Sequence, residues 1–175
     1  RADPMQAGRV SRVARSLFAQ LWPVLGQTAV PDVLLNKLDW AARLHEIGHL
    51  ISHTDAHKHG AYILDNSDTT GFTLPELHRL GLLVLGQRGK VRKLELPDND
   101  PVMAAQLLAL RLAVVLCHAR QDPVVDPLRL ECHQNARRFA LLAPQAWLDS
   151  YPQSAHLLRE EMQAWDRSGW TFVLQ

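Results

Sequence analysis

Residues 45–59, HEIGHLISHTDAHKH, hold five of the nine histidines in this 175-residue chain. The apolar residues that lead into them recur with helical spacing, which predicts a helix over residues 33–53. Side chains three and four positions apart share one face of a helix, so His45 continues the apolar line of Leu38 and Ala41. We therefore expect His45 to point into the protein core.

Helical spacing and strand-like alternation recur along the rest of the chain. The further predicted helices span residues 5–22, 57–64, 73–85, 101–120, 144–151 and 153–165. Residues 128–132 alternate with a period of two, residues 138–142 are the expected antiparallel partner, and residues 169–174 indicate a terminal strand. The predicted fold class is mainly α. It comprises an HD-like helical domain over residues 1–124, followed by a small α+β unit with a short antiparallel sheet over residues 125–175.

Composition limits the classes of protein that this chain can represent. Hydrophobic residues make up 47% of the chain, which is enough for a substantial core. The formal net charge of +1 does not by itself indicate a charged binding partner. Cys117 and Cys132 are too few for a disulfide framework and favour a reducing, cytoplasmic setting. No apolar run is long enough to span a membrane, and no signal peptide is visible.

The segment from His45 to His49 matches the zinc-peptidase signature H-E-x-x-H. Two histidines four positions apart on a helix can share one zinc ion, with the glutamate between them as general base. One extended version of the signature requires glycine and histidine where this chain has Ser52 and Asp55, and another needs a downstream glutamate, for which Glu76 is the only candidate. A zinc metallopeptidase is therefore the least favoured interpretation.

The adjacent pair His45-Glu46 is also similar to the His-Asp pair of HD phosphohydrolases. In those enzymes the pair lies on a buried helix and binds metal together with further histidines and a late aspartate, and the metal activates water against phosphate. This chain has glutamate in place of the aspartate, and Val114 stands where the last metal aspartate would fall. We therefore predict a degenerate HD pair without a catalytic metal. A stand-alone HD-like metal-dependent phosphohydrolase remains an alternative.

Residues 40–48 (WAARLHEIG), 57–64 (HKHGAYIL) and 66–72 (NSDTTGF) form the most specific block of the sequence. Together with residues 110–113 they resemble the C-terminal region of the exopolyphosphatase / guanosine pentaphosphate phosphohydrolase family. The resemblance covers nearly the whole chain and implies a helical domain followed by a small mixed domain. In that family, two preceding actin-like domains hold the catalytic carboxylates, the phosphate-binding loop and the magnesium. The C-terminal region is implicated in binding polyphosphate and in forming a dimer.

The resemblance implies a role for this chain as part of a larger enzyme. We expect it to be the polyphosphate-binding and dimerisation region, with no catalytic residue and no cofactor of its own, and inactive by itself. The implied partners are the actin-like domains of the same chain, polyphosphate or guanosine pentaphosphate, and a second copy. Neither a membrane nor a nucleic acid is implied. The sequence leaves open which of the two substrates the parent enzyme prefers.

Clustered cations and histidines supply the candidate binding residues. A dense linear anion gains Coulombic attraction and counterion release from cations along its path, and arginine can make two bonds to one phosphate. The predicted polyphosphate-binding residues are His57, Lys58, His59, Arg88, Lys90, Arg92 and Lys93. Arg9, Arg12 and Arg15 add a basic stripe on the first predicted helix, whereas His49 and His53 are interpreted as structural residues. The competing interpretation of the basic run is a solvated loop that keeps the protein in solution.

Other polar positions indicate local structure. Thr73, followed three positions later by Glu76, predicts a capped helix start. Arg111 lies within an apolar helix and needs a partner if it is buried, and Glu46 is the candidate partner. Gln87 stands where many members of the resembled family have histidine, which weakens the case for a metal.

Overall fold

The computed structural model describes residues 3–26 and 28–175. Its α-helices are α1 (Pro4–Leu25), α2 (Asp32–Leu44), α3 (Ala56–Asp65), α4 (Leu74–Gly86), α5 (Pro101–Leu116), α6 (Gln145–Ser150) and α7 (Pro152–Ala164). Its strands are β1 (Arg129–His133), β2 (Arg138–Leu142) and β3 (Thr171–Leu174), and its short 3-10 turns are η1 (Ile47–Leu50), η2 (Val91–Lys93) and η3 (Gln134–Ala136). The architecture is mainly α with a small α+β segment at the C-terminal end, as predicted. None of the described helices is both long enough and apolar enough to cross a membrane.

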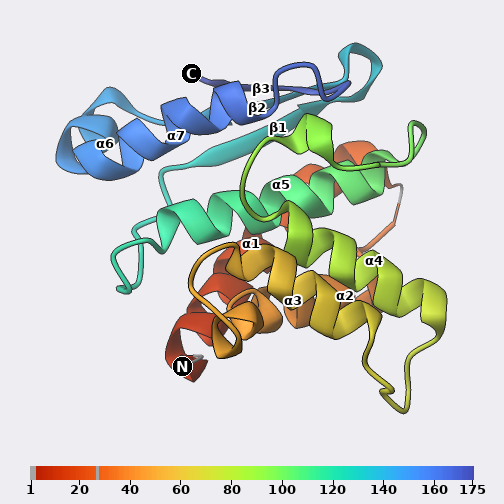
Figure 1. Cartoon of the computed structure of the whole chain (residues 1–175). Helices are drawn as coiled ribbons and strands as arrows, with labels where there is room; N and C mark the ends of the chain where they lie inside the picture. Colours follow the sequence, from red (N-terminus) through yellow and green to blue (C-terminus); the bar gives the residue numbers. More distant parts are fainter. Residues whose placement is uncertain (1–2, 27) are drawn as a thin grey trace.

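The helix α5 forms the centre of the protein (Figure 1). Nearly all of its side chains are apolar and most of them are buried, and a helix that is apolar all round belongs in a core. α1 packs along it with a buried face that repeats every three or four residues and includes Val10, Ala14 and Leu17. Figure 1 shows α2, α3 and α4 on one side of α5, and the sheet with α6 and α7 on the other.

The strands form a mixed sheet in the order β1-β2-β3. β1 and β2 are antiparallel, with Arg129 opposite Leu142, so the predicted antiparallel pair is confirmed. β3 instead runs parallel to β2. α7 lies between these two strands along the chain, and a helical crossover of this kind returns the chain in the same direction. The predicted terminal strand therefore adds a parallel edge to the sheet.

One hydrophobic cluster joins the helices to the sheet. It includes Leu108 of α5 and Phe139 of β2, both of which are completely buried. Phe139 also meets Trp165, just after α7, edge to face, with ring centroids 5.9 Å apart. The division into domains 1–124 and 125–175 stays a prediction, and residues 125–175 are called the C-terminal segment below.

The predicted helix over residues 33–53 is wrong in its second half. α2 ends just before the H-E-x-x-H signature, and the chain continues through η1 before α3 begins. After this break Gly48 packs directly against the start of α3, where only glycine fits: a Cβ atom on Gly48 would lie 1.6 Å from the carbonyl oxygen of Ala56. His45 and His49 therefore do not lie one turn apart on an α-helix, which is the arrangement that the zinc-peptidase signature needs.

The helix α4 begins as predicted, at Thr73. The hydroxyl of Thr73 accepts a hydrogen bond from the backbone N–H of Glu76 at 3.3 Å, and the Glu76 carboxylate accepts one from the backbone N–H of Thr73 at 2.9 Å. This reciprocal capping box satisfies two N–H groups that a helix start otherwise leaves without partners. From this fixed start, α4 carries the chain to Gly86, where the basic run begins.

Candidate functional site

A small polar pocket lies at the end of α2. It has a volume of about 150 Å³ and is walled by η1, the start of α3 and the turn after α4. Its lining residues are His45, Glu46, His49, His53, Asp55, Ala56, His57, Gln87 and Arg88. The fold thus brings four of the five clustered histidines together with one residue of the basic run, which lies in a distant part of the sequence. We call this the histidine pocket.

His45 forms a buried wall of the histidine pocket, as its place on the apolar line predicted. Its Nδ1 lies 2.6 Å from the carbonyl oxygen of Ala42, and because a carbonyl oxygen only accepts, Nδ1 carries the proton of the ring. Burial lowers the pKa of His45 and outweighs the opposing effects of this hydrogen bond and of Glu46. The backbone carbonyl of His45 accepts a hydrogen bond from Nε2 of Gln87 at 2.6 Å. The ring is therefore neutral at pH 7, and the residue is tied to the turn after α4.

Glu46, the second member of the degenerate HD pair, is held by a guanidinium group. Its Oε1 accepts from Nη2 of Arg120 at 2.5 Å, and the same arginine reaches Asp3 at 3.1 Å. The predicted pairing of Glu46 with Arg111 is wrong. Arg111 lies on the face of α5 that meets α7, and it pairs there with Glu161 at 2.5 Å. Arg120, in the loop after α5, reaches Glu46 instead.

His49 and His53 line the histidine pocket, although sequence reasoning set them aside as structural residues. Their ring centroids are 4.9 Å apart. Burial lowers the pKa of His49 and of His57, so these rings also favour the neutral form. Within residues 3–26 and 28–175, no group of three or more histidine, cysteine, aspartate or glutamate side chains is arranged to hold a metal ion.

One signal in the sequence could have identified these pocket residues. Histidine recurs at every fourth position from His45 to His57. On one continuous helix this spacing would form a slanted row along the surface. The break at Gly48 instead bends the segment, so that the same four rings surround a hollow.

The predicted polyphosphate-binding residues divide into pocket residues and surface residues. His57 and Arg88 line the histidine pocket. Lys90, Arg92 and Lys93 are exposed on the stretch that follows Arg88, and within the described part of the chain they form no ion pair. We call residues 86–93 the basic turn. Its free cations continue the positive charge that Arg88 brings to the pocket.

Lys58 and His59 follow His57 in the sequence but do not line the pocket. The ammonium group of Lys58 pairs with the carboxylate of Asp55 at 3.1 Å and holds the pKa of that carboxyl below its usual range. Lys58 therefore lies beside an acidic residue of the pocket in an exposed ion pair, and the contact of Lys58 and His59 with polyphosphate stays a prediction.

The predicted basic stripe on the first helix is wrong for Arg9, whereas Arg12 is exposed and forms a surface ion pair. Arg9 is buried and its Nε lies 3.2 Å from Asp122, while Arg12 reaches the same carboxylate at 2.8 Å. Arg15 remains exposed. Asp122 lies in the loop after α5, and α5 packs on α1, so this pairing depends on helix packing that the sequence does not show.

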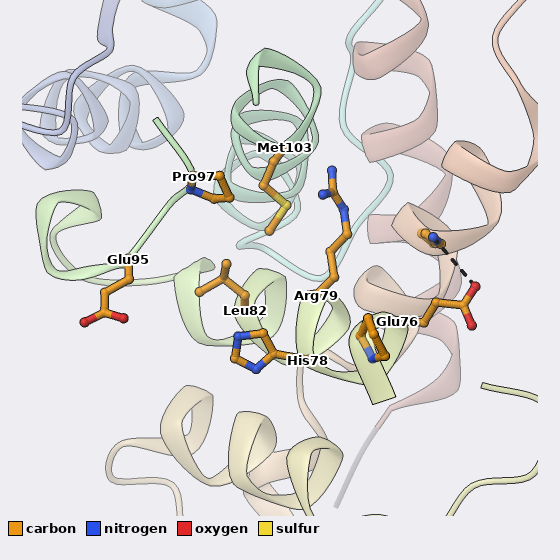
Figure 2. Close-up of a pocket in the computed structure, with 9 residues that line it drawn as sticks. Glu76, His78, Arg79, Leu82, Glu95, Pro97 and Met103 are labelled. Atoms are coloured by element: carbon orange, nitrogen blue, oxygen red, sulfur yellow. Dashed lines mark ion pairs between the residues drawn. The ribbon is translucent and has the colours of Figure 1, made fainter. Parts of the chain in front are cut away.

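A larger hollow lies between α4 and the segment before α5 (Figure 2). Figure 2 shows Glu76, His78, Arg79 and Leu82 along α4, with Glu95, Pro97 and Met103 across from them. Arg79 is tied to Asp100 at 2.7 Å, and Lys37 is paired with Glu76 at 3.8 Å. Glu95 adds a further exposed carboxylate. The cations of this hollow already have partners, so it suits a polyanion less well than the histidine pocket does.

Acidification is expected to destabilise the protein through the histidine pocket. The folded-state pKa of His45 lies below the ordinary value of 6.5, so the unfolded chain binds a proton first and stability is lost as the pH falls below that value. The charged groups that act on His45 are Glu46, Arg88 and Arg120. Urea unfolding at about pH 7.5, 6.5 and 5.5 measures the effect, and the free energy of unfolding should decrease toward the lowest pH.

A matched pair of variants separates this effect from general acid sensitivity. His45→Gln keeps a neutral donor for the Ala42 carbonyl at every pH and should flatten the pH dependence. His156→Gln removes an exposed histidine and should leave the pH dependence unchanged. If both variants behave alike, burial of His45 is not the cause.

Comparison with known protein families places these features in a phosphatase family. The family model described as Ppx/GppA phosphatase, domain III, matches residues 1–163. This match takes in every helix described above except the last residue of α7, and it includes the whole histidine pocket. The chain therefore belongs to the Ppx/GppA phosphatase family, and the resemblance carried by residues 40–72 is confirmed.

Three proteins named guanosine-5'-triphosphate,3'-diphosphate pyrophosphatase are similar to the chain. The protein of Pseudoalteromonas translucida is 30% identical over 178 residues, which cover 98% of this chain and 34% of that protein. Those of Aeromonas hydrophila and Aeromonas salmonicida are 33% and 32% identical, each over 96% of this chain and 34% of the relative. The chain thus spans about a third of the length of the curated relatives that it matches.

Proposed function

We propose that this chain is the polyphosphate-binding and dimerisation part of an exopolyphosphatase or guanosine pentaphosphate phosphohydrolase. Family membership and the names of the three relatives support a role in such an enzyme. Hydrolysis then takes place in actin-like domains of the parent enzyme, which use magnesium, while this chain contributes affinity for the substrate. The buried, unpaired thiols of Cys117 and Cys132 support a reducing, cytoplasmic setting.

The histidine pocket carries this proposal. Arg88 lines it beside four histidines, and arginine can bind a phosphate group through two parallel N–H···O bonds. Both carboxylates of the pocket are already neutralised, Glu46 by Arg120 and Asp55 by Lys58. A bound phosphate would therefore meet the guanidinium donors of Arg88 without meeting an unpaired carboxylate.

The size of the pocket favours one phosphate group over a whole nucleotide. Its volume of about 150 Å³ is below the range of roughly 300–1,000 Å³ that is usual for pockets holding drug-sized ligands. The exposed cations Lys90, Arg92 and Lys93 follow Arg88 directly along the chain. We propose that one phosphate occupies the pocket and that the rest of the polyphosphate chain lies along the basic turn, where each cation releases counterions.

Joint replacement of Arg88, Lys90, Arg92 and Lys93 with alanine tests this proposal. The variant should bind fluorescently labelled polyphosphate at least about a hundredfold more weakly at low salt, because one pocket contact and three surface contacts are lost. The slope of log affinity against log salt should fall by roughly 0.7 for each lost contact. The matched control replaces four exposed arginines of the C-terminal segment, Arg129, Arg137, Arg159 and Arg167, and makes the same change in net charge.

The control decides between specific binding and general attraction. If both quadruple variants lose the same affinity, binding follows net charge and the pocket has no special part in it. If the unaltered chain does not bind polyphosphate, the proposal fails. The family resemblance supports the dimerisation part of the proposal, and sedimentation equilibrium tests it. A mass of 19.7 kDa, that of one chain, at every protein concentration would contradict dimerisation.

A further inference from the structure

A buried ion pair joins α5 to α7. Arg111 and Glu161 have side chains that are 4% and 6% exposed, and Nε of Arg111 lies 2.5 Å from Oε1 of Glu161. Nη2 of Arg111 donates to the other carboxylate oxygen at 3.2 Å, so the pair is bidentate. Nε1 of Trp165 also donates to Oε1 of Glu161, at 2.8 Å. The carboxylate is therefore held in one position by three N–H donors from two residues.

The same guanidinium group also holds the start of the basic turn. Nη1 of Arg111 donates to the carbonyl oxygen of Gly86 at 2.5 Å, and Nη2 donates to that of Gly89 at 2.9 Å. The Gly86 carbonyl belongs to the last residue of α4, where a helix has no backbone donor to offer. Gly89 has a φ of 78°, so the chain reverses there in a conformation that favours glycine. Arg88 lies between these two anchored carbonyls.

We propose that Arg111 is a positioning residue, through which Glu161 of the C-terminal segment holds Arg88 at the histidine pocket. This inference rests on the proposed function, because it assigns a purpose to the placement of Arg88. The charge of Arg111 is neutralised by Glu161, so its contribution is to geometry and not to attraction of the anion. Gln87 completes the arrangement from the other side, through its hydrogen bond to the carbonyl of His45.

The chemistry of burial explains why the two residues act together. A buried guanidinium without its carboxylate is an uncompensated charge and draws water or moves toward solvent. Either response breaks the hydrogen bonds to the carbonyls of Gly86 and Gly89. Arg88 would then have to be ordered when the ligand binds, and that ordering lowers the affinity. Loss of this ion pair would therefore weaken ligand binding at the pocket, although neither Arg111 nor Glu161 lines the pocket.

Glu161→Gln tests the inference, with Glu160→Gln as its matched control. Both changes remove one negative charge from neighbouring positions of α7, but the Glu160 side chain is 61% exposed. Hydrogen–deuterium exchange of the unliganded 175-residue chain should be about tenfold faster for residues 86–93 in Glu161→Gln and unchanged in Glu160→Gln. Labelled polyphosphate should bind about threefold to tenfold more weakly to Glu161→Gln than to Glu160→Gln.

Two further variants keep the test decisive if Glu161→Gln folds poorly. Trp165→Phe keeps an aromatic side chain, although a smaller one, but removes the N–H donor to Glu161, and should raise exchange in the basic turn by a smaller factor. Arg111→Lys keeps the charge, but a lysine side chain cannot bind two carbonyls and a carboxylate at once. This variant should raise hydrogen–deuterium exchange in the basic turn at least as much as Glu161→Gln.

The outcomes separate this inference from the proposed function. A lower melting temperature for Glu161→Gln, with neither faster exchange confined to the basic turn nor weaker polyphosphate binding, would overturn the inference and leave Arg111 a purely structural residue. If the unaltered chain binds no polyphosphate, the proposed function fails. In that case, faster exchange of the basic turn in Glu161→Gln would still support the inference that Glu161 and Arg111 position Arg88.

Discussion

Replacing Gly48 with alanine is expected to destabilise the protein by about 3 kcal/mol. The added Cβ atom would lie 1.6 Å from the carbonyl oxygen of Ala56 and 2.7 Å from the backbone nitrogen of Gly60. Both neighbours are backbone atoms, so the clash cannot be relieved by rotating a side chain. η1 and α3 would have to move apart, and the histidine pocket between them would open. Thermal unfolding followed by circular dichroism should show a midpoint lower by roughly 10 °C.

Gly8→Ala is the matched control for this prediction. Gly8 lies within α1, and the nearest atom to an added Cβ is Nη1 of Arg12, at 3.8 Å. Alanine should therefore fit there and stabilise α1 by about 0.5–1 kcal/mol, because glycine loses more backbone entropy in a helix. If Gly48→Ala unfolds at the same temperature as the unaltered protein, the close approach of η1 to α3 is not real.

Replacing Arg88 with alanine is expected to weaken polyphosphate binding by about tenfold or more, since a hydrogen bond to a charged group contributes about 1.5–3 kcal/mol. Lys93→Ala should weaken it only about twofold, because Lys93 lies outside the histidine pocket and its attraction to the anion is screened by salt. The difference follows from the structure: both side chains are exposed, but Arg88 lines the histidine pocket and Lys93 does not. Fluorescence anisotropy with labelled polyphosphate, at low and at physiological salt, measures both affinities.

Two controls accompany this comparison. Arg88→Lys keeps the charge without the planar fork and should fall between the unaltered chain and Arg88→Ala. Arg159→Ala removes an exposed cation of α7 and should have almost no effect. Equal losses for Arg88→Ala and Lys93→Ala would mean that the anion lies only along the basic turn and does not enter the pocket.

The features that sequence reasoning predicted correctly are those with short-range causes. The apolar run of α5 predicts burial because each of its faces is apolar. The capping box of Thr73 and Glu76 satisfies groups within three positions of each other. The antiparallel pairing of β1 and β2 joins segments that are close along the chain.

The features that sequence reasoning missed depend on contacts between distant segments. The apolar spacing that continues into residues 45–53 would allow α2 to continue, but α2 ends at Leu44 and the segment after it packs through Gly48 on α3. The parallel pairing of β3 with β2 requires α7 to cross over between them. His49 and His53 look like structural residues until the bend at η1 places them around a hollow.

The sequence by itself determined the mainly α fold, the inward direction of His45 and the family, because periodicity and specific motifs are local properties of the chain. Only the tertiary structure decided which acid each arginine meets. The sequence suggested Arg111 as the partner of Glu46, but Glu46 pairs with Arg120, and Arg111 pairs with Glu161, which lies 50 positions away. Burial makes the pair of Arg111 and Glu161 obligatory, since an unpaired charge in the core is costly. The same pairing leaves Arg88 and the cations after it without a partner among the described residues, and so able to meet phosphate.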